Sequence, residues 1–316
     1  MKRVITTACL LLSFFSAELI EAKPPIQVFV LAGQSNMEGQ GVVDLDHEEY
    51  YNGGKGTLNS VIESDKSGRY RHVIDGRSNY LKRDDVFVRF ETRQGLKTGG
   101  LSIGFTGYPG QHHIGPEFQF GHVIGNEIRK PVLLIKTAWG GKSLYKDFRP
   151  PLSGGITGEY YTRMLREVDE ALANIQEENL ELAGRRYEIS GFVWFQGWND
   201  MYDEGARNEY AINLANLILG VREALDRPEL PVVVGELGNG GSDTSDNMQS
   251  IRDAQRTATL DPRLNGNVRF VQTHQFARPA DQSPNVGHAH HWFGNAESYF
   301  LIGDAFGKAM LDLLKR

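Results

Sequence analysis

The 316-residue sequence predicts an α/β fold, with a mainly parallel sheet between two layers of helices. Strand-like and helix-like segments alternate over its second half, which is typical of parallel sheets covered on both faces. The strand-like segments are apolar without a polar face, as expected for strands buried on both sides. With 40% hydrophobic residues, no repeat and no biased linker, residues 23–316 are expected to form one large domain.

The first 22 residues have the layout of a secretory signal, with Lys2 and Arg3 followed by an apolar run over 4–17 and a cleavage point after Ala22. The alternative is a membrane anchor, but the run is shorter than the roughly 20 residues that span a bilayer. Cys9, the only cysteine, lies inside this segment. We therefore expect a secreted or periplasmic protein that has no disulfide and no membrane association after cleavage.

The first strand is expected where the run "VFVLAG" begins at Val28, and the polar sequence "QSNMEGQG" follows it. Ser35 would then lie at the carboxyl end of a parallel strand, where sites form in such sheets. The alternative role for Ser35 is to cap the next helix, for which serine is a preferred residue. The stretch is not the nucleophile elbow of α/β-hydrolases, because Met37 occupies a position that requires glycine.

A long insertion is expected around residues 44–110, which are rich in Gly, Asp, Arg and Tyr and contain one strand-like run at 86–93. The segment 115–121, "GPEFQFG", is expected to begin a helix with Pro116 at its first position.

The remaining elements follow in regular order after the insertion. The expected strands are residues 131–139, 189–196, 231–238 and 268–276, and the expected helices are 158–179, 204–227, 245–260 and 295–316. Three of these strands lead into segments that draw attention. They are "WGG" at 139–141, "GWND" at 197–200 and "GHAHHWFGNAE" at 287–297, which precedes the last helix.

Taken together, "AGQSNM", "TAWGGKSL", "QGWND" and a histidine before the last helix resemble the SGNH hydrolases. The order of the motifs is more similar to the branch that contains carbohydrate esterase family six and the sialate O-acetylesterase-like proteins. The resemblance covers most of residues 23–316. It implies a flavodoxin-like, three-layer α/β/α sandwich and a secreted serine esterase that removes short acyl groups, acetyl above all, from carbohydrates.

The resemblance also implies roles for individual residues. Ser35 corresponds to the nucleophile and Asn199 to an oxyanion-hole donor, beside the Ser35 N–H and the N–H of Gly140 or Gly141. His291 corresponds to the base, with His290 as the alternative. Trp198 is a departure, because many relatives have an acidic residue there.

The acidic member of the triad is the least defined part of the site. His288 occupies the position three residues before the histidine where relatives have aspartate. Asp281 is the nearest carboxylate upstream, and a loop of that length can bring it to the histidine ring, where it would fix the tautomer and favour the imidazolium. The alternative is a solvated loop aspartate.

The chemistry explains the choice of residue types. A serine hydroxyl is a poor nucleophile at neutral pH, so a histidine must remove its proton as it attacks an ester carbonyl. Preplaced N–H donors then stabilise the negative oxygen of the tetrahedral intermediate.

Two other functions stay open. His288, His290 and His291 could form a metal site, since zinc commonly takes three protein ligands, although no matching His, Asp or Glu pair at helical spacing occurs elsewhere. The second alternative is that the protein is a catalytically weak relative of the same fold that binds carbohydrate. We expect no metal or other cofactor, and the formal net charge of −6 gives no basic excess for nucleic acid.

Substrate contacts are expected from residues beside the motifs. Trp198 and Trp292 would hold a sugar ring, because sugars present apolar C–H faces to aromatic rings, while Trp194 is expected in the core. Gln34 and Gln196 are expected to bind substrate as well. The predicted partner is therefore an acetylated carbohydrate.

Overall fold

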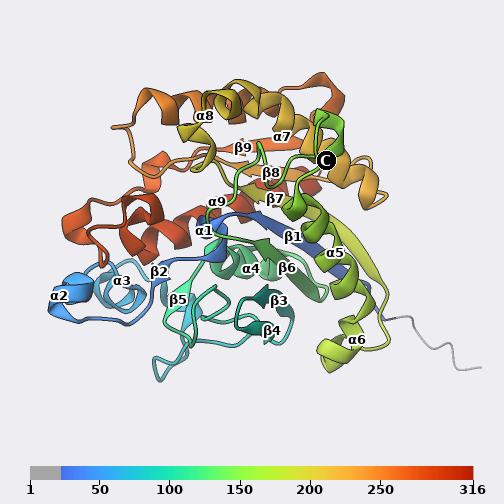
Figure 1. Cartoon of the computed structure of the whole chain (residues 1–316). Coiled ribbons are helices and arrows are strands. Elements are labelled where there is room, and N and C mark those ends of the chain that lie inside the picture. The colour runs from blue at the N-terminus through green and yellow to red at the C-terminus, as the bar shows by residue number, and fades with distance from the viewer. Residues whose placement is uncertain (1–22, 316) are drawn as a thin grey trace, which may run out of the picture.

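The computed structural model describes residues 23–315, so the predicted signal segment at 1–22 lies outside the described residues. Within the described part, a seven-stranded sheet has the order β4-β3-β6-β1-β7-β8-β9, and a separate two-stranded ladder joins β2 to β5. All neighbours in the large sheet are parallel except β3 and β4, which are antiparallel. Helices cover the sheet (Figure 1). The predicted fold class is confirmed.

The strands of the large sheet are β1 (Ile26–Gly33), β3 (Val86–Thr92), β4 (Gly95–Gly100), β6 (Val132–Ala138), β7 (Tyr187–Phe195), β8 (Val232–Gly235) and β9 (Val268–Val271). The strands of the small ladder are β2 (Gly41–Val42) and β5 (His113–Ile114). The α-helices are α1 (Ser35–Glu38), α2 (Glu48–Tyr51), α3 (Leu58–Ser64), α4 (Pro116–Glu127), α5 (Glu159–Ala173), α6 (Ile175–Glu178), α7 (Glu204–Ala224), α8 (Asp246–Ala258) and α9 (Ala296–Leu314).

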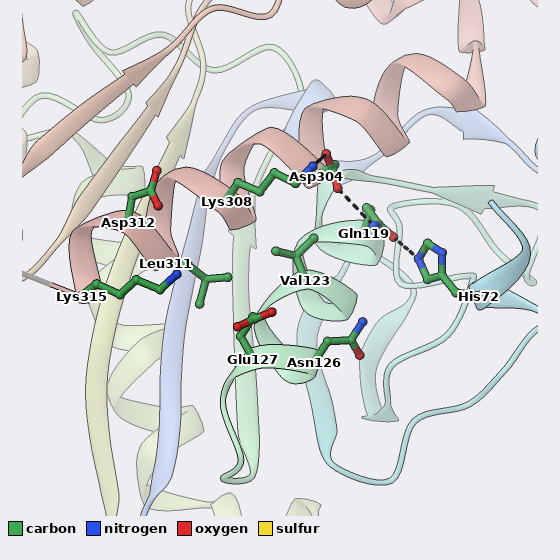
Figure 2. Close-up of a pocket in the computed structure, with 10 residues that line it drawn as sticks. All are labelled: His72, Gln119, Val123, Asn126, Glu127, Asp304, Lys308, Leu311, Asp312 and Lys315. Carbon is green, nitrogen blue, oxygen red and sulfur yellow. Dashed lines mark hydrogen bonds and ion pairs between the residues drawn. The ribbon is translucent and has the colours of Figure 1, made fainter. Parts of the chain in front are cut away.

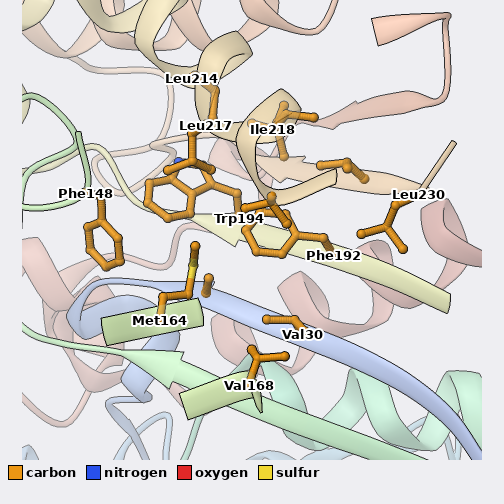
Figure 3. Packing of buried hydrophobic residues seen from close by; sticks show 14 of the residues in the cluster. Val30, Phe148, Met164, Val168, Phe192, Trp194, Leu214, Leu217, Ile218 and Leu230 are labelled. Carbon is orange, nitrogen blue, oxygen red and sulfur yellow. The ribbon is translucent and has the colours of Figure 1, made fainter. Parts of the chain in front are cut away.

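The apolar run of β1 feeds two cores because alternate side chains of a strand point to opposite faces. Val28 and Val30 belong to a cluster that includes residues of α5, α7 and α8. Phe29 and Leu31 belong to a second cluster, with residues of α3, α4 and α9. Figure 3 shows part of the first cluster, where Trp194 packs among aliphatic side chains and the rings of Phe148 and Phe192. Trp194 is fully buried, as expected for a core residue.

Segments 86–92 and 95–100 take part in the main sheet as β3 and β4, which form a hairpin at one edge. The turn of this hairpin, at Arg93 and Gln94, reaches the candidate site. α4 begins at Pro116, as expected from its fixed backbone angle. The expected helix 158–179 is divided at Asn174 into α5 and the short α6.

No helix within residues 23–315 combines the length and the apolar character that crossing a membrane requires.

Candidate active site

A pocket of about 580 Å³ opens at the carboxyl ends of the parallel strands. Its walls come from the segments that follow β1, β3, β6 and β7, together with the loop that precedes α9. It is lined by Gln34, Ser35, Glu38, Gln40, Arg93, Gln94, Gly107, Tyr108, Pro109, Gly140, Gly141, Trp198, Asn199, His290 and His291. Most of the predicted site residues therefore meet here, whereas Gln196, Asp281 and Trp292 do not line this pocket.

Ser35 is the first residue of α1 and is 8% exposed. The strand before it approaches β7 so closely that a Cβ on Gly33 would lie 2.1 Å from the Phe195 carbonyl oxygen, and only glycine fits there. The Ser35 N–H belongs to the first turn of a helix, whose N–H groups have no intrahelical partner. Among the described residues it has no other acceptor, so it is free for a substrate oxygen.

Gln34 fixes the loop after β7. Its Oε1 accepts hydrogen bonds from the N–H groups of Gly197 (3.1 Å) and Trp198 (3.0 Å), and its Nε2 donates to Asn199 Oδ1 (3.1 Å). Because Oε1 receives two donors, Nε2 must be the donor to Asn199, which leaves the Asn199 NH₂ group for the pocket. Gln34 was expected to bind substrate. Only 2% of its surface is exposed, and its hydrogen bonds go to the loop that holds Asn199.

Gln196 is also engaged by the protein itself. Its Nε2 donates to the Lys142 carbonyl and to the Asp200 carboxylate, and its Oε1 accepts from the Tyr210 hydroxyl. Asp200, which is fully buried, also accepts the N–H groups of Leu144 and Tyr145 at 2.9 Å each. Burial raises the pKa of Asp200 to about 6. Gln196 and Asp200 therefore connect the loop after β7 to the loop after β6.

Gly140 and Gly141 suit glycine for different reasons. A Cβ on Gly140 would lie 3.0 Å from Glu38 Oε2 and 3.6 Å from the Ser35 Cβ, so its backbone lies close to Ser35. Gly141 has a φ of +74°, which favours glycine. Burial raises the pKa of Glu38 in spite of the Lys136 and Arg93 charges and the Gly140 backbone nearby.

Two histidine rings, His290 and His291, line the pocket with their centroids 4.0 Å apart. The loop is held by the His290 carbonyl, which accepts from Asn36 Nδ2 (3.1 Å) and Asn239 Nδ2 (3.0 Å). Between the Ser35 hydroxyl and either ring, the described residues show no direct hydrogen bond. Such catalytic bonds often tighten only when substrate binds.

The electrostatics of this loop favour neutral rings. Burial, together with repulsion from His290 and His288, lowers the pKa of His291 to about 3. Burial and His288 lower the pKa of His290 as well. A neutral imidazole can accept a proton, which is what a general base needs. His288 itself is exposed and does not line the pocket.

No carboxylate within residues 23–315 forms an ion pair with the ring of His290 or His291. Asp281 is exposed in the short turn Ala280–Gln282, and its backbone carbonyl accepts from Asn52 Nδ2. Its assignment as the acid stays a prediction without a supporting contact. Nor does this described part hold three or more His, Cys, Asp or Glu side chains arranged for a metal ion.

The tryptophans divide between the pocket and the core. Trp198 is half-buried and lines the pocket, with its ring 5.8 Å from that of His290. Trp292, expected to hold sugar, is 2% exposed and packs in the second core cluster. Its small exposed part faces a different hollow, beside residues 277–280. Its backbone has a left-handed φ of +54°, directly after His291.

A buried ion pair beneath the pocket was not anticipated. Lys136 Nζ donates to Glu117 Oε2 (2.7 Å), and both side chains are fully buried. The same ammonium donates to the carbonyls of Glu38 (2.9 Å) and Phe105 (2.6 Å). It thus joins the end of the Ser35 helix to the loop that forms the opposite wall. A lysine inside the apolar run "PVLLIKTAW" was the signal available in the sequence.

That opposite wall is also fixed by Tyr108. Its hydroxyl donates to Gln40 Oε1 (2.6 Å), and Gln40 Nε2 donates to the Ser35 carbonyl (3.1 Å). Lys97 donates to the backbone carbonyl of Tyr108 and to two more in the same loop. Neither Tyr108 nor Arg93, which brings a positive charge to the pocket, could be linked to Ser35 by sequence spacing.

A second hollow, of about 390 Å³, lies between α4 and α9 (Figure 2). Four of its polar side chains form a chain of hydrogen bonds: His72 bonds to Gln119, Gln119 to Asp304, and Asp304 to Lys308. None of the predicted catalytic residues lies there.

An open, mainly parallel sheet with Ser, Asn, Gly and His gathered at its carboxyl edge defines an SGNH-like α/β hydrolase. The family model for carbohydrate esterases described as sialic acid-specific acetylesterases matches residues 25–312, and the chain belongs to this family. It is therefore a carboxylic ester hydrolase of the carbohydrate acetylesterase class. The resemblance found in the sequence is confirmed.

Individual relatives agree with this assignment. A probable carbohydrate esterase of Arabidopsis thaliana is 25% identical over 238 residues, which are 73% of this chain and 75% of that protein. An X-ray structure of an Arabidopsis thaliana protein matches with a TM-score of 0.58 and 19% identity, over 92% of this chain and 99% of that one.

Two further solved structures share the fold. A novel carbohydrate acetylesterase from Xanthomonas citri matches with a TM-score of 0.54 and 14% identity, over 92% of this chain and 56% of that one. NanS matches with a TM-score of 0.56 and 13% identity, over 94% of this chain and 99% of that one.

Proposed function

We propose that this esterase removes acetyl groups from a carbohydrate by a serine mechanism, with Ser35 as nucleophile and His291 as base. The observation that carries the proposal is the single pocket that brings Ser35, Asn199, the two glycines and the histidines together. These residues come from distant parts of the sequence, and their chemistry matches the needs of acyl transfer. The family supports an acetylated sugar as the substrate.

In the first half of the reaction, Ser35 Oγ attacks the acetyl carbonyl carbon while the hydroxyl proton passes to the neutral His291 ring. The carbonyl oxygen becomes negative and accepts hydrogen bonds from the Ser35 N–H and the Asn199 NH₂ group. The bond from the acyl carbon to the sugar oxygen then breaks, and His291 returns its proton to that oxygen. The products are the free sugar hydroxyl and an acetyl-serine.

In the second half, His291 takes a proton from water as the water oxygen attacks the acetyl-serine. The bond to Ser35 Oγ breaks, Oγ regains a proton from His291, and acetate leaves. The third donor of the oxyanion hole would be the backbone N–H of Gly140 or of Gly141, both of which line the pocket beside Ser35.

Hydrolysis of p-nitrophenyl acetate and of acetylated xylan, pectin and sialic acid, each with and without a chelator, tests this function. We expect turnover that the chelator leaves intact and labelling of Ser35 by an organophosphate. Loss of activity with chelator would favour a metal site built on His288, His290 and His291. If no ester is hydrolysed but the protein binds to one of the glycans, the result would favour a carbohydrate-binding relative.

We also propose that residues 1–22 direct export and are removed. Amino-terminal sequencing of the exported protein should begin at Lys23. A mature chain that starts at Met1 would contradict this.

A further inference from the structure

Four aromatic rings follow one another across the mouth of the pocket. The rings of His288 and His290 are 5.6 Å apart, those of His290 and Trp198 are 5.8 Å apart, and those of Trp198 and Tyr202 are 5.9 Å apart. We call this set the ring row. Its inner members, His290 and Trp198, line the pocket, whereas His288 and Tyr202 lie beyond the lining residues.

Tyr202 is unusual for its exposure on a fixed turn. It is 66% exposed, although it directly follows the loop that holds Asn199. That turn is anchored by the buried Asp200 carboxylate, and Arg207 donates to the Met201 carbonyl at 2.7 Å. A turn whose backbone is fixed before a ligand arrives loses little conformational entropy when the ligand stacks on the ring that it presents.

We propose that the ring row binds a second sugar unit adjacent to the acetylated one, so that the substrate is an oligosaccharide or polysaccharide rather than a free monosaccharide. The inference rests on the proposed function of the pocket. One sugar ring covers about one aromatic ring, so the acetylated sugar at Trp198 leaves Tyr202 available for its neighbour. The lowered pKa of His290 keeps that ring uncharged at neutral pH, which suits apolar C–H contact.

The experiment compares acetylated xylotetraose with acetylated xylose, and O-acetylated sialic acid at the end of a trisaccharide with the free O-acetylated sugar. For the sugar that is turned over, we expect kcat/KM of the wild type to be higher on the longer substrate. Loss of one stacking ring in Tyr202→Ala should lower that value about ten-fold, mostly through KM, and should spare the short substrate and p-nitrophenyl acetate. Tyr202→Phe, which keeps the ring, should behave as the wild type.

Tyr50 provides a matched control, because it is also 66% exposed and stacks on a histidine, His47, away from the pocket. Tyr50→Ala should leave kcat/KM unchanged on both the long and the short substrate. Equal losses on long and short substrates in Tyr202→Ala, or no preference of the wild type for the longer one, would overturn the ring-row proposal while leaving the esterase function intact. Absence of any esterase activity would instead refute the function on which it rests.

Discussion

At the residue scale, the proposed chemistry depends on a serine and a histidine that reach the same pocket from opposite ends of the chain. Ser35→Ala should lower esterase activity at least about 1000-fold, as loss of a catalytic triad member does in other hydrolases. His291→Ala should match it, and the double variant should be little worse, because the two act as a unit. Activity on p-nitrophenyl acetate and an unchanged circular dichroism spectrum provide the measurement and its control.

Two variants resolve the remaining assignments around the base. If His291 is the base, His290→Ala should lower esterase activity only slightly. A larger loss in His290→Ala than in His291→Ala would make His290 the base. Asp281→Asn should reduce activity less than loss of the base does. The Asp281 side chain is exposed and lies outside the pocket. An unchanged rate in Asp281→Asn would mean that Ser35 and His291 act without this acid.

The pH dependence follows from the surroundings of His291. His291, the proposed base, must be neutral to accept a proton, and its pKa is lowered to about 3 by burial and by the neighbouring histidines. The acid limb of kcat/KM should therefore lie well below the ordinary histidine value of about 6.5. His288→Ala removes one repelling neighbour and should move the limb toward higher pH. A limb at 6.5 in the wild type would contradict the depressed pKa, provided that the protein is folded at each pH.

At the element scale, β6 and α4 support α1 through the buried pair of Lys136 and Glu117. Glu117→Gln leaves the Lys136 charge without its partner and should cost about 3 to 5 kcal/mol of unfolding free energy, measured in urea. Replacing both, with Lys136→Met and Glu117→Gln together, should recover much of that stability.

The double variant separates stability from positioning. Without the Lys136 ammonium, the carbonyls of Glu38 and Phe105 lose the donor that joins them. We therefore expect kcat to stay low in a protein that is folded and stable. Full recovery of kcat along with stability would mean that the pair supports the fold alone.

At the scale of the whole molecule, buried histidines make stability depend on pH. Burial lowers the pKa of His113 to about 4 and that of His122 to about 3. The unfolded chain binds more protons than the folded one between these values and about 6.5, so stability rises with pH across that window and is lost as pH falls through it. Asp200, with a raised pKa of about 6, acts in the opposite direction between its ordinary value and 6.

Urea unfolding at pH 5 and pH 7.5 measures this effect. The wild type should be more stable at pH 7.5, by up to about 2 kcal/mol for each buried histidine. His122→Gln should show a smaller difference between the two pH values, because it removes one such group. The same difference in both proteins would show that His122 does not contribute.

The site also shows which features the sequence alone could indicate. The buried runs of β1, β6 and β7 depend on local patterns of apolar residues, which are visible in the sequence. Because the carboxyl ends of parallel strands share one edge, the sequence alone could predict that Ser35, Gly140 and Asn199 lie close together. His291 was placed by its resemblance to relatives, and its role stays a prediction.

Other features depend on which loops meet in space. Asp281 and Trp292 lie near His291 in sequence, yet the tryptophan is buried in the core and Asp281 is exposed outside the pocket. Spacing along a chain limits how far apart two residues can be but does not fix where their side chains point.

By itself, the sequence determined the α/β class, the strand that leads to Ser35 and the family of esterases, because apolar periodicity and short motifs are local properties. Only the tertiary structure decided that Gln34 orients Asn199, that Lys136 joins α1 to the opposite wall and that Trp198 meets the ring of His290. These are contacts between residues up to about 165 positions apart. They form only when the sheet sets its loops side by side, because a hydrogen bond or a ring contact depends on distances that folding alone fixes.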